Sequence, residues 1–196
     1  MATVTPQPPP IVNLPNQLTA SRLVLALVLF ALIAWAQWIA CVVVFAVAAL
    51  TDYLDGYFAR KHGLTSALGR NFDPLVDKVL ICGAYIFLQP VEAAGLMPWM
   101  TTLVVARELI ITSLRGFLES EGIKFGADWL GKLKMGLQCA ALYGIFVYLD
   151  LHGRGVEANV DLFFGVVRDL LIYAMLAATA LSGLQYLWRA AQLLKV

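Results

Sequence analysis

Charged residues are scarce in this chain of 196 residues, where they make up 14%, against roughly 25% in a soluble domain. Hydrophobic residues make up 61% instead. A soluble protein of this size has too little interior to bury so much apolar surface. The composition therefore excludes an ordinary cytosolic domain and a disordered chain, and it predicts an integral membrane protein.

The chain also lacks a charge bias, a paired set of cysteines and a basic amino terminus. Its 14 Lys and Arg residues balance 13 Asp and Glu residues, so nothing points to nucleic acid. The three cysteines, Cys41, Cys82 and Cys139, have no CxxC spacing and predict neither a disulfide framework nor a metal site. The first seventeen residues contain no Lys or Arg, so we expect no cleavable secretory signal. We expect a disordered, proline-rich tail over residues 1–12 and a single membrane domain over residues 13–196.

Long apolar runs are what the chain has in abundance. A helix that crosses a bilayer needs about 20 apolar residues, and candidate stretches occur at 18–36, 39–50, 76–91, 96–118, 130–149 and 162–187. They predict an all-α bundle of six transmembrane helices. With the amino terminus inside, only Arg154 and Arg168 of the fourteen basic residues fall outside, in agreement with the positive-inside rule.

An acidic segment connects the second and third apolar stretches. Residues 52–77 read DYLDGYFARKHGLTSALGRNFDPLVD. Asp52 and Asp55 share one helix face, and Asp73 and Asp77 share another, because residues three or four apart are neighbours on a helix. A short link between the two helices makes them antiparallel, so the four carboxylates should converge near the inner surface. Converging carboxylates repel unless they are neutralised, and a hard cation such as Mg²⁺ is bound by oxygen ligands of this kind. The segment therefore predicts a site for divalent metal ions.

Small residues and one arginine accompany the four carboxylates. Gly56, Ala59 and Gly69 remove bulk beside them and let a ligand approach closely. Arg60 offers a bidentate donor that suits a diphosphate. These neighbours favour a phosphate-containing substrate.

The spacing D-x2-D-G-x2-A-R-x8-G-x3-D-x3-D resembles the signature of the CDP-alcohol phosphotransferase family at all eight defined positions. Members of this family have six transmembrane helices. They transfer a phosphate-linked alcohol from a CDP-alcohol to a hydroxyl acceptor and release CMP. The resemblance thus implies an enzyme of the bacterial cytoplasmic membrane, with its active site facing the cytosol and, as is common in the family, a homodimer.

The resemblance also implies a role for each signature residue. Two Mg²⁺ or Mn²⁺ ions would be held by Asp52, Asp55, Asp73 and Asp77. The CDP group would contact Asp55, Gly56, Ala59, Arg60 and Gly69. Asp77 would also accept the proton of the acceptor hydroxyl.

Further stretches resemble the family members that use CDP-diacylglycerol as donor and sn-glycerol 3-phosphate as acceptor. They are LPNQLTASR (14–22), ARELIITSLRGFLESEG (106–122) and DWLGKLK (128–134). A dianionic acceptor needs a basic pocket, and the candidate residues are Arg107, Arg115, Lys132 and Lys134. Arg107 and Arg115 lie about 80° apart around a helix, so both can border one cavity. Met135 departs from the threonine that is common at its position.

Several alternatives stay open. The four aspartates could form a structural salt-bridge network, Arg107 and Glu108 could neutralise each other, and Lys132 and Lys134 could contact anionic lipid. Arg22 could be an interfacial anchor or could contact a ligand. The acceptor could be serine, an inositol phosphate or phosphatidylglycerol. A metal-ion transporter is an alternative of another class, but its pathway would need polar groups across the whole bilayer.

Overall fold

The structure, a computed structural model, describes the backbone of residues 14–62, 67–122 and 129–193 and the side chains of residues 20–51, 75–122 and 129–193. These residues form six α-helices, one short 3₁₀ helix and no strand, which confirms the all-helical prediction. The α-helices are α1 (Leu14–Ala34), α2 (Trp38–His62), α3 (Ala67–Leu88), α4 (Pro98–Ser120), α5 (Trp129–Gly153) and α6 (Ala158–Leu193), and the 3₁₀ helix is η1 (Glu92–Ala94). The expected tail of residues 1–12 lies outside the described residues.

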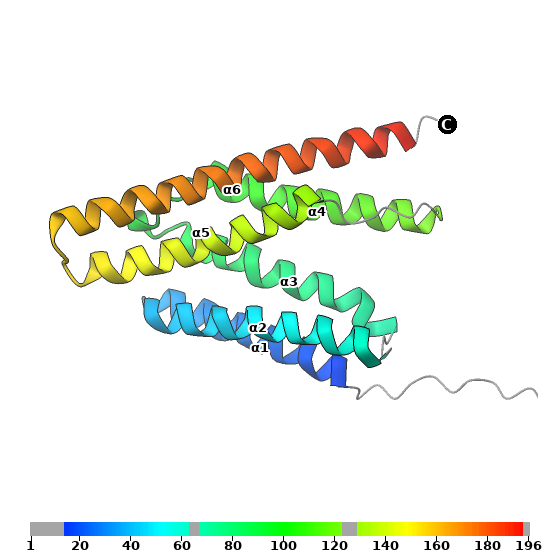
Figure 1. The fold of residues 1–196 in the computed structure, drawn as a ribbon, viewed down its shortest axis with the longest axis horizontal. Coiled ribbons are helices and arrows are strands. Elements are labelled where there is room, and N and C mark those ends of the chain that lie inside the picture. The colour runs from blue at the N-terminus through cyan, green and yellow to red at the C-terminus, as the bar shows by residue number, and fades with distance from the viewer. Residues whose placement is uncertain (1–13, 63–66, 123–128, 194–196) are drawn as a thin grey trace, which may run out of the picture.

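The helices lie along the length of one elongated bundle (Figure 1). Successive helices run in opposite directions, since short links such as the one at Gly155 (φ 65°) reverse the chain between α5 and α6. Helix α1 contacts α2 and α3, helix α2 packs on α5, and α6 packs on α4 and α5. One end of the bundle holds the starts of α1, α3 and α5 and the ends of α2, α4 and α6 (Figure 1). We call it the terminal end.

Aromatic side chains join the helices in the apolar core. Phe45 on α2 meets Phe146 on α5 edge to face, with 6.3 Å between ring centroids. Phe30 on α1 stacks on Phe87 of α3 at 4.9 Å. Gly83 makes room for that contact, because a Cβ atom there would lie 2.2 Å from Phe30 Cζ. The contact between Phe30 and Phe87 holds α1 against α3. These two helices carry Arg22 and the last aspartate of the signature.

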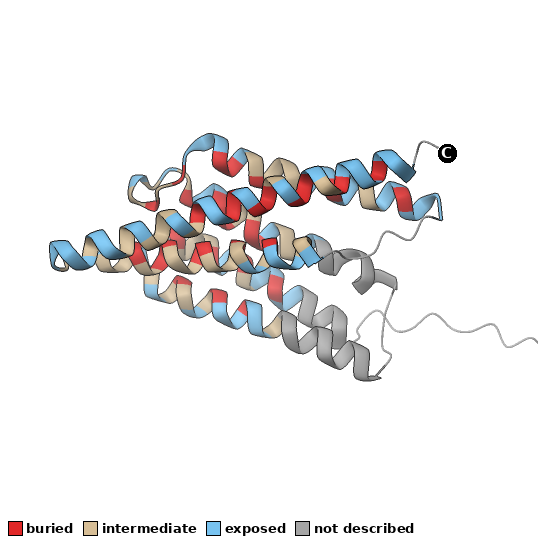
Figure 2. Ribbon diagram, turned by 45° about the horizontal axis from the view of Figure 1, so that its top comes forward, coloured by how far each residue is buried: buried red, intermediate tan, exposed pale blue. Residues whose placement is uncertain are grey.

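Large apolar side chains lie on the outside of the bundle as well as in its core. The exposed faces (Figure 2) carry large apolar side chains, among them Leu27 on α1 and Leu162 and Leu184 on α6. Buried positions, in contrast, include Glu108 and Lys134. Charged residues are almost never buried in this way unless they are paired, so their partners are central to the site.

Among the described residues, α6 is the helix whose length and composition would let it cross a membrane. Shorter apolar segments occur at Ala20–Ala34 and Trp38–Thr51. Helix α4 carries Arg107, Glu108 and Arg115 within its length, so charged residues interrupt its apolar sequence. The structure thus confirms six helices, and the number that cross the bilayer is a proposal developed below.

Candidate functional site

The acidic segment lies on the last turns of α2 and the first turns of α3, at the terminal end of the bundle (Figure 1). Asp77 is the one member of the signature whose side chain falls within the described residues. The side chains outside them are those of Asp52, Asp55, Gly56, Ala59, Arg60, Gly69 and Asp73. Convergence of the four carboxylates therefore stays a prediction.

Asp77 forms an ion pair with an arginine from another helix. Arg22 Nη1, on α1, donates a hydrogen bond to Asp77 Oδ1. The Arg22 side chain is only 3% exposed, whereas that of Asp77 is 28% exposed. Arg22 is therefore buried against the signature rather than anchored at an interface. A charge inside an apolar stretch is the sequence signal that marks such a residue.

A second group of polar residues is buried between α4 and α5, and we call it the Glu108 cluster (Arg107, Glu108, Lys134 and Gln138). Glu108 Oε1 accepts hydrogen bonds from Lys134 Nζ, from Arg107 Nη1 at 3.2 Å and from Gln138 Nε2 at 3.4 Å. Burying an unpaired carboxylate costs several kcal/mol, so these donors are needed to keep Glu108 charged inside the bundle. Two cations meet one carboxylate, and the cluster carries a net positive charge.

Two side chains of α6 contact the two arginines of α4. The Tyr186 ring centroid lies 5.7 Å from the guanidinium carbon of Arg107 and 5.7 Å from that of Arg115. Tyr186 Oη accepts a hydrogen bond from Arg115 Nη2 at 3.1 Å, and Ser182 Oγ accepts one from Arg107 Nη2 at 3.1 Å. Cation–π contacts and hydrogen bonds of this kind orient both guanidinium groups before any ligand binds. The sequence offered no signal for Tyr186 or Ser182, which lie more than seventy residues away along the chain.

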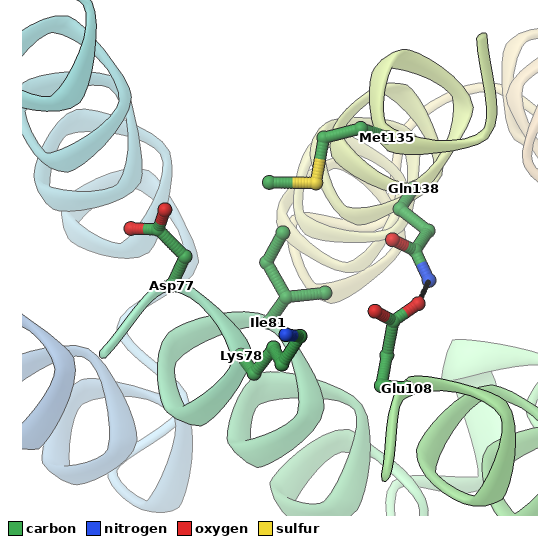
Figure 3. A pocket seen from close by; sticks show the side chains of 6 residues that line it. All are labelled: Asp77, Lys78, Ile81, Glu108, Met135 and Gln138. Carbon is green, nitrogen blue, oxygen red and sulfur yellow. Dashed lines mark hydrogen bonds between the residues drawn. The ribbon is translucent and has the colours of Figure 1, made fainter. Parts of the chain in front are cut away.

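A pocket of about 160 Å³ opens between α3, α4 and α5. Its lining residues are Asp77, Lys78, Ile81, Glu108, Met135 and Gln138. Figure 3 shows Asp77 on one side of the pocket and the Glu108–Gln138 pair on the other, with Ile81 and Met135 between them. The pocket thus connects the signature with the Glu108 cluster.

The structure places the four predicted acceptor-binding cations in different surroundings. Arg107 and Lys134 contact Glu108, and Arg115 contacts Tyr186. Lys132 is exposed on the surface of α5. The direct ion pair of Arg107 with Glu108 agrees with the alternative in which these two charges neutralise each other. Binding of an acceptor by any of the four stays a prediction.

Of the four aspartates predicted to hold metal ions, Asp77 is the one whose carboxylate the structure describes. The Asp77 carboxylate is paired with Arg22, and its side chain is still partly exposed. Such oxygens are the ligands that Mg²⁺ prefers. Among the described side chains, no three His, Cys, Asp or Glu residues are grouped so that they could hold a metal ion, and the side chains of Asp52, Asp55 and Asp73 lie outside that part of the chain.

Comparison with known proteins agrees with the signature. A family model described as CDP-alcohol phosphatidyltransferase matches residues 12–181. The chain is 31% identical to the CDP-diacylglycerol–glycerol-3-phosphate 3-phosphatidyltransferase of Bacillus subtilis, over 89% of this chain and 93% of that protein. It is 35% identical to the probable phosphatidylglycerophosphate synthase of Mycobacterium tuberculosis, over 92% of this chain and 82% of that protein. The family and the enzyme class predicted from the signature are confirmed, and the chain belongs to the CDP-alcohol phosphatidyltransferase family.

Proposed function

We propose that this enzyme transfers the phosphatidyl group of CDP-diacylglycerol to sn-glycerol 3-phosphate and releases phosphatidylglycerophosphate and CMP. The observation that carries the proposal is the pocket that joins Asp77 to a buried cluster of net positive charge. Relatives whose names state this donor and this acceptor align over most of the chain and support the choice of substrates.

The diphosphate of the donor would lie at the signature on α2 and α3. Asp52, Asp55, Asp73 and Asp77 would hold two divalent ions, Mg²⁺ or Mn²⁺. When bound, these ions supply polarisation of the diphosphate and stabilise negative charge on the departing CMP. Arg60 would donate to the diphosphate, while Gly56, Ala59 and Gly69 would leave room for the nucleotide.

Asp77 would act as the base. The acceptor hydroxyl oxygen forms a bond to the β-phosphorus, its proton passes to the Asp77 carboxylate, and the bond between the β-phosphorus and the CMP oxygen breaks with its electron pair. A carboxylate has modest basicity, so its position relative to the hydroxyl matters most. The ion pair with Arg22 supports this role because it fixes the carboxylate at the edge of the pocket.

The acceptor phosphate would bind on the opposite side of the pocket. Arg107 and Lys134 bring positive charge to Glu108, which is one of the lining residues. Arg115 lies on the same side of α4 as Arg107, oriented by Tyr186. Lys132 is the fourth cation that the sequence predicts for the acceptor. Because it is exposed, it would attract the acceptor from solution rather than bind it inside the pocket.

We infer that all six helices cross the bilayer, with the terminal end at the cytosolic side. Exposed apolar faces and internally paired charges support this arrangement. Exposed tryptophans occur near both ends of the bundle, Trp35 and Trp99 at one and Trp129 and Trp188 at the other, as interfacial aromatics do. The acyl chains of the donor then stay in lipid while its diphosphate reaches the signature. A homodimer, as the family implies, is part of this proposal.

A screen of acceptors tests the proposed reaction. We expect the purified protein, supplied with CDP-diacylglycerol and Mg²⁺, to release CMP with glycerol 3-phosphate at least about tenfold faster than with serine, an inositol phosphate or phosphatidylglycerol, because only an anionic acceptor of the right size uses the buried cations. A matched preparation without acceptor gives the rate of donor hydrolysis. CMP release with another acceptor alone would reject the proposed substrate.

A further inference from the structure

Lys78 is a cation in the pocket that the mechanism above does not use. It lies on α3, its side chain is half-buried, and it lines the same pocket as Asp77 and Glu108 (Figure 3). Within the part of the chain that the structure describes, its ammonium group forms no hydrogen bond and no ion pair. The Glu108 and Asp77 carboxylates act on it electrostatically without a direct ion pair. A lysine held in this state beside a pocket is therefore placed to meet a ligand.

The charges around the pocket favour an anionic ligand. Each carboxylate that lines the pocket already has a cation: Asp77 is paired with Arg22, and Glu108 with Lys134 and Arg107. Lys78 adds a further positive charge that no described carboxylate matches by an ion pair. A phosphomonoester dianion would compensate this excess, whereas a neutral alcohol or a zwitterion would not. Inside a bundle of low polarity such differences are large, because charge interactions there are weakly screened.

The position of Lys78 also fits the proposed chemistry. Lys78 follows Asp77 directly, and successive side chains on a helix diverge by about 100°. In Figure 3 the ammonium group of Lys78 lies between Asp77 and Glu108, and all three residues line the pocket. An acceptor whose phosphate contacts Lys78 can therefore extend its hydroxyl toward Asp77. Glycerol 3-phosphate has these two groups at opposite ends of a three-carbon chain.

We propose that Lys78 binds the phosphate group of the acceptor and thereby selects a phosphorylated alcohol. The proposal rests on the proposed function, since it assigns a ligand to the pocket beside Asp77. It differs from the predicted roles of Arg107, Arg115, Lys132 and Lys134, because Lys78 is a cation next to the base on the same helix.

Kinetics of the Lys78→Gln variant test the proposal. We expect KM for glycerol 3-phosphate to rise about tenfold or more, as befits loss of a hydrogen bond between charged groups, while KM for CDP-diacylglycerol stays as in the wild type. Lys78→Arg keeps the charge and should recover part of the loss. Arg154→Gln is the matched control, since it removes an exposed cation from the opposite end of the bundle. An unchanged KM for the acceptor, or an equal rise for both substrates, would overturn the proposal.

A measurement on the wild-type protein gives a result even if the Gln variant does not fold. Acylation of lysines followed by mass spectrometry should show that glycerol 3-phosphate and inorganic phosphate slow the labelling of Lys78, and that glycerol does not. Labelling of Lys78 at the same rate with and without phosphate would overturn the proposal.

The same experiments separate the proposal from the proposed function. If the wild type uses a different phosphorylated acceptor, the assigned substrate is wrong, and the effect of Lys78→Gln on the KM for that acceptor decides the role of Lys78. If the wild type uses only an acceptor without a phosphate, both proposals fail.

Discussion

Replacing Asp77 with Asn lowers kcat by about 10²–10⁴-fold, the usual contribution of a positioned base. Asparagine has nearly the same shape but cannot accept the proton of the acceptor hydroxyl. Binding of CDP-diacylglycerol should persist largely unchanged, because Asp52, Asp55 and Asp73 would still hold the diphosphate through metal ions. Rates of CMP release and binding of a CDP-containing ligand, measured on the same preparation, check both expectations.

A loss of fold could imitate this result, because Asp77→Asn leaves the buried Arg22 without its carboxylate. Breaking a fully buried ion pair costs about 3–5 kcal/mol, and the partial exposure of Asp77 reduces that figure. The double variant Arg22→Gln, Asp77→Asn removes both charges. We expect it to recover thermal stability relative to Asp77→Asn but not to recover turnover. An Asp77→Asn enzyme with substantial activity would contradict the role of Asp77 as the base.

Replacing Glu108 with Ala destabilises the protein by about 3–5 kcal/mol, since it leaves the cations of Lys134 and Arg107 together without their shared carboxylate. Thermal unfolding in detergent, followed by tryptophan fluorescence, measures the change. Glu119→Ala is the matched control because Glu119 lies on the same helix and is exposed. That variant should unfold at the wild-type temperature.

A second variant identifies the cause of the loss. Glu108→Gln combined with Lys134→Met removes one negative and one positive charge and keeps the side-chain volumes similar. Because replacing both members of a buried pair is often nearly neutral, we expect this double variant to be more stable than Glu108→Ala. A Glu108→Ala protein as stable as the Glu119→Ala control would show that the Glu108 cluster does not hold α4 against α5.

The helices were predictable from apolar runs, but several of their ends were not. The second apolar stretch ends at Leu50, whereas α2 continues to His62. Its last turns are polar because they carry the signature at the terminal end, so hydrophobicity alone misses them. Helix α6 extends beyond both ends of the predicted stretch 162–187, where Asp161 precedes the stretch and Arg189 follows it.

Spacing along a single helix predicts which site residues share a face of that helix. The spacing of Asp73 and Asp77 predicts that both share one face of α3, and the side chain of Asp73 lies outside the described residues. The same geometry separates Lys132 from Lys134. These two lysines lie two residues apart, so they point about 200° apart around α5, and the structure accordingly exposes Lys132 and buries Lys134. Helical geometry therefore predicts different surroundings for the two lysines, and acceptor binding by either one stays a prediction.

Pairings between distant segments could not be derived in this way. Arg22 meets Asp77 across 55 residues, and Lys134 meets Glu108 across 26. Such contacts depend on which helices are neighbours in the bundle, and an apolar run carries no information about its neighbours. A buried charge in the sequence shows only that a partner must exist.

Anomalous diffraction from crystals grown with Mn²⁺ tests most directly whether the four aspartates share divalent ions at the terminal end. We expect two anomalous peaks per chain, both surrounded by carboxylate oxygens of Asp52, Asp55, Asp73 and Asp77. Peaks at other residues, or the four carboxylates turned away from one another with no ion between them, would contradict the proposed metal site and the mechanism built on it.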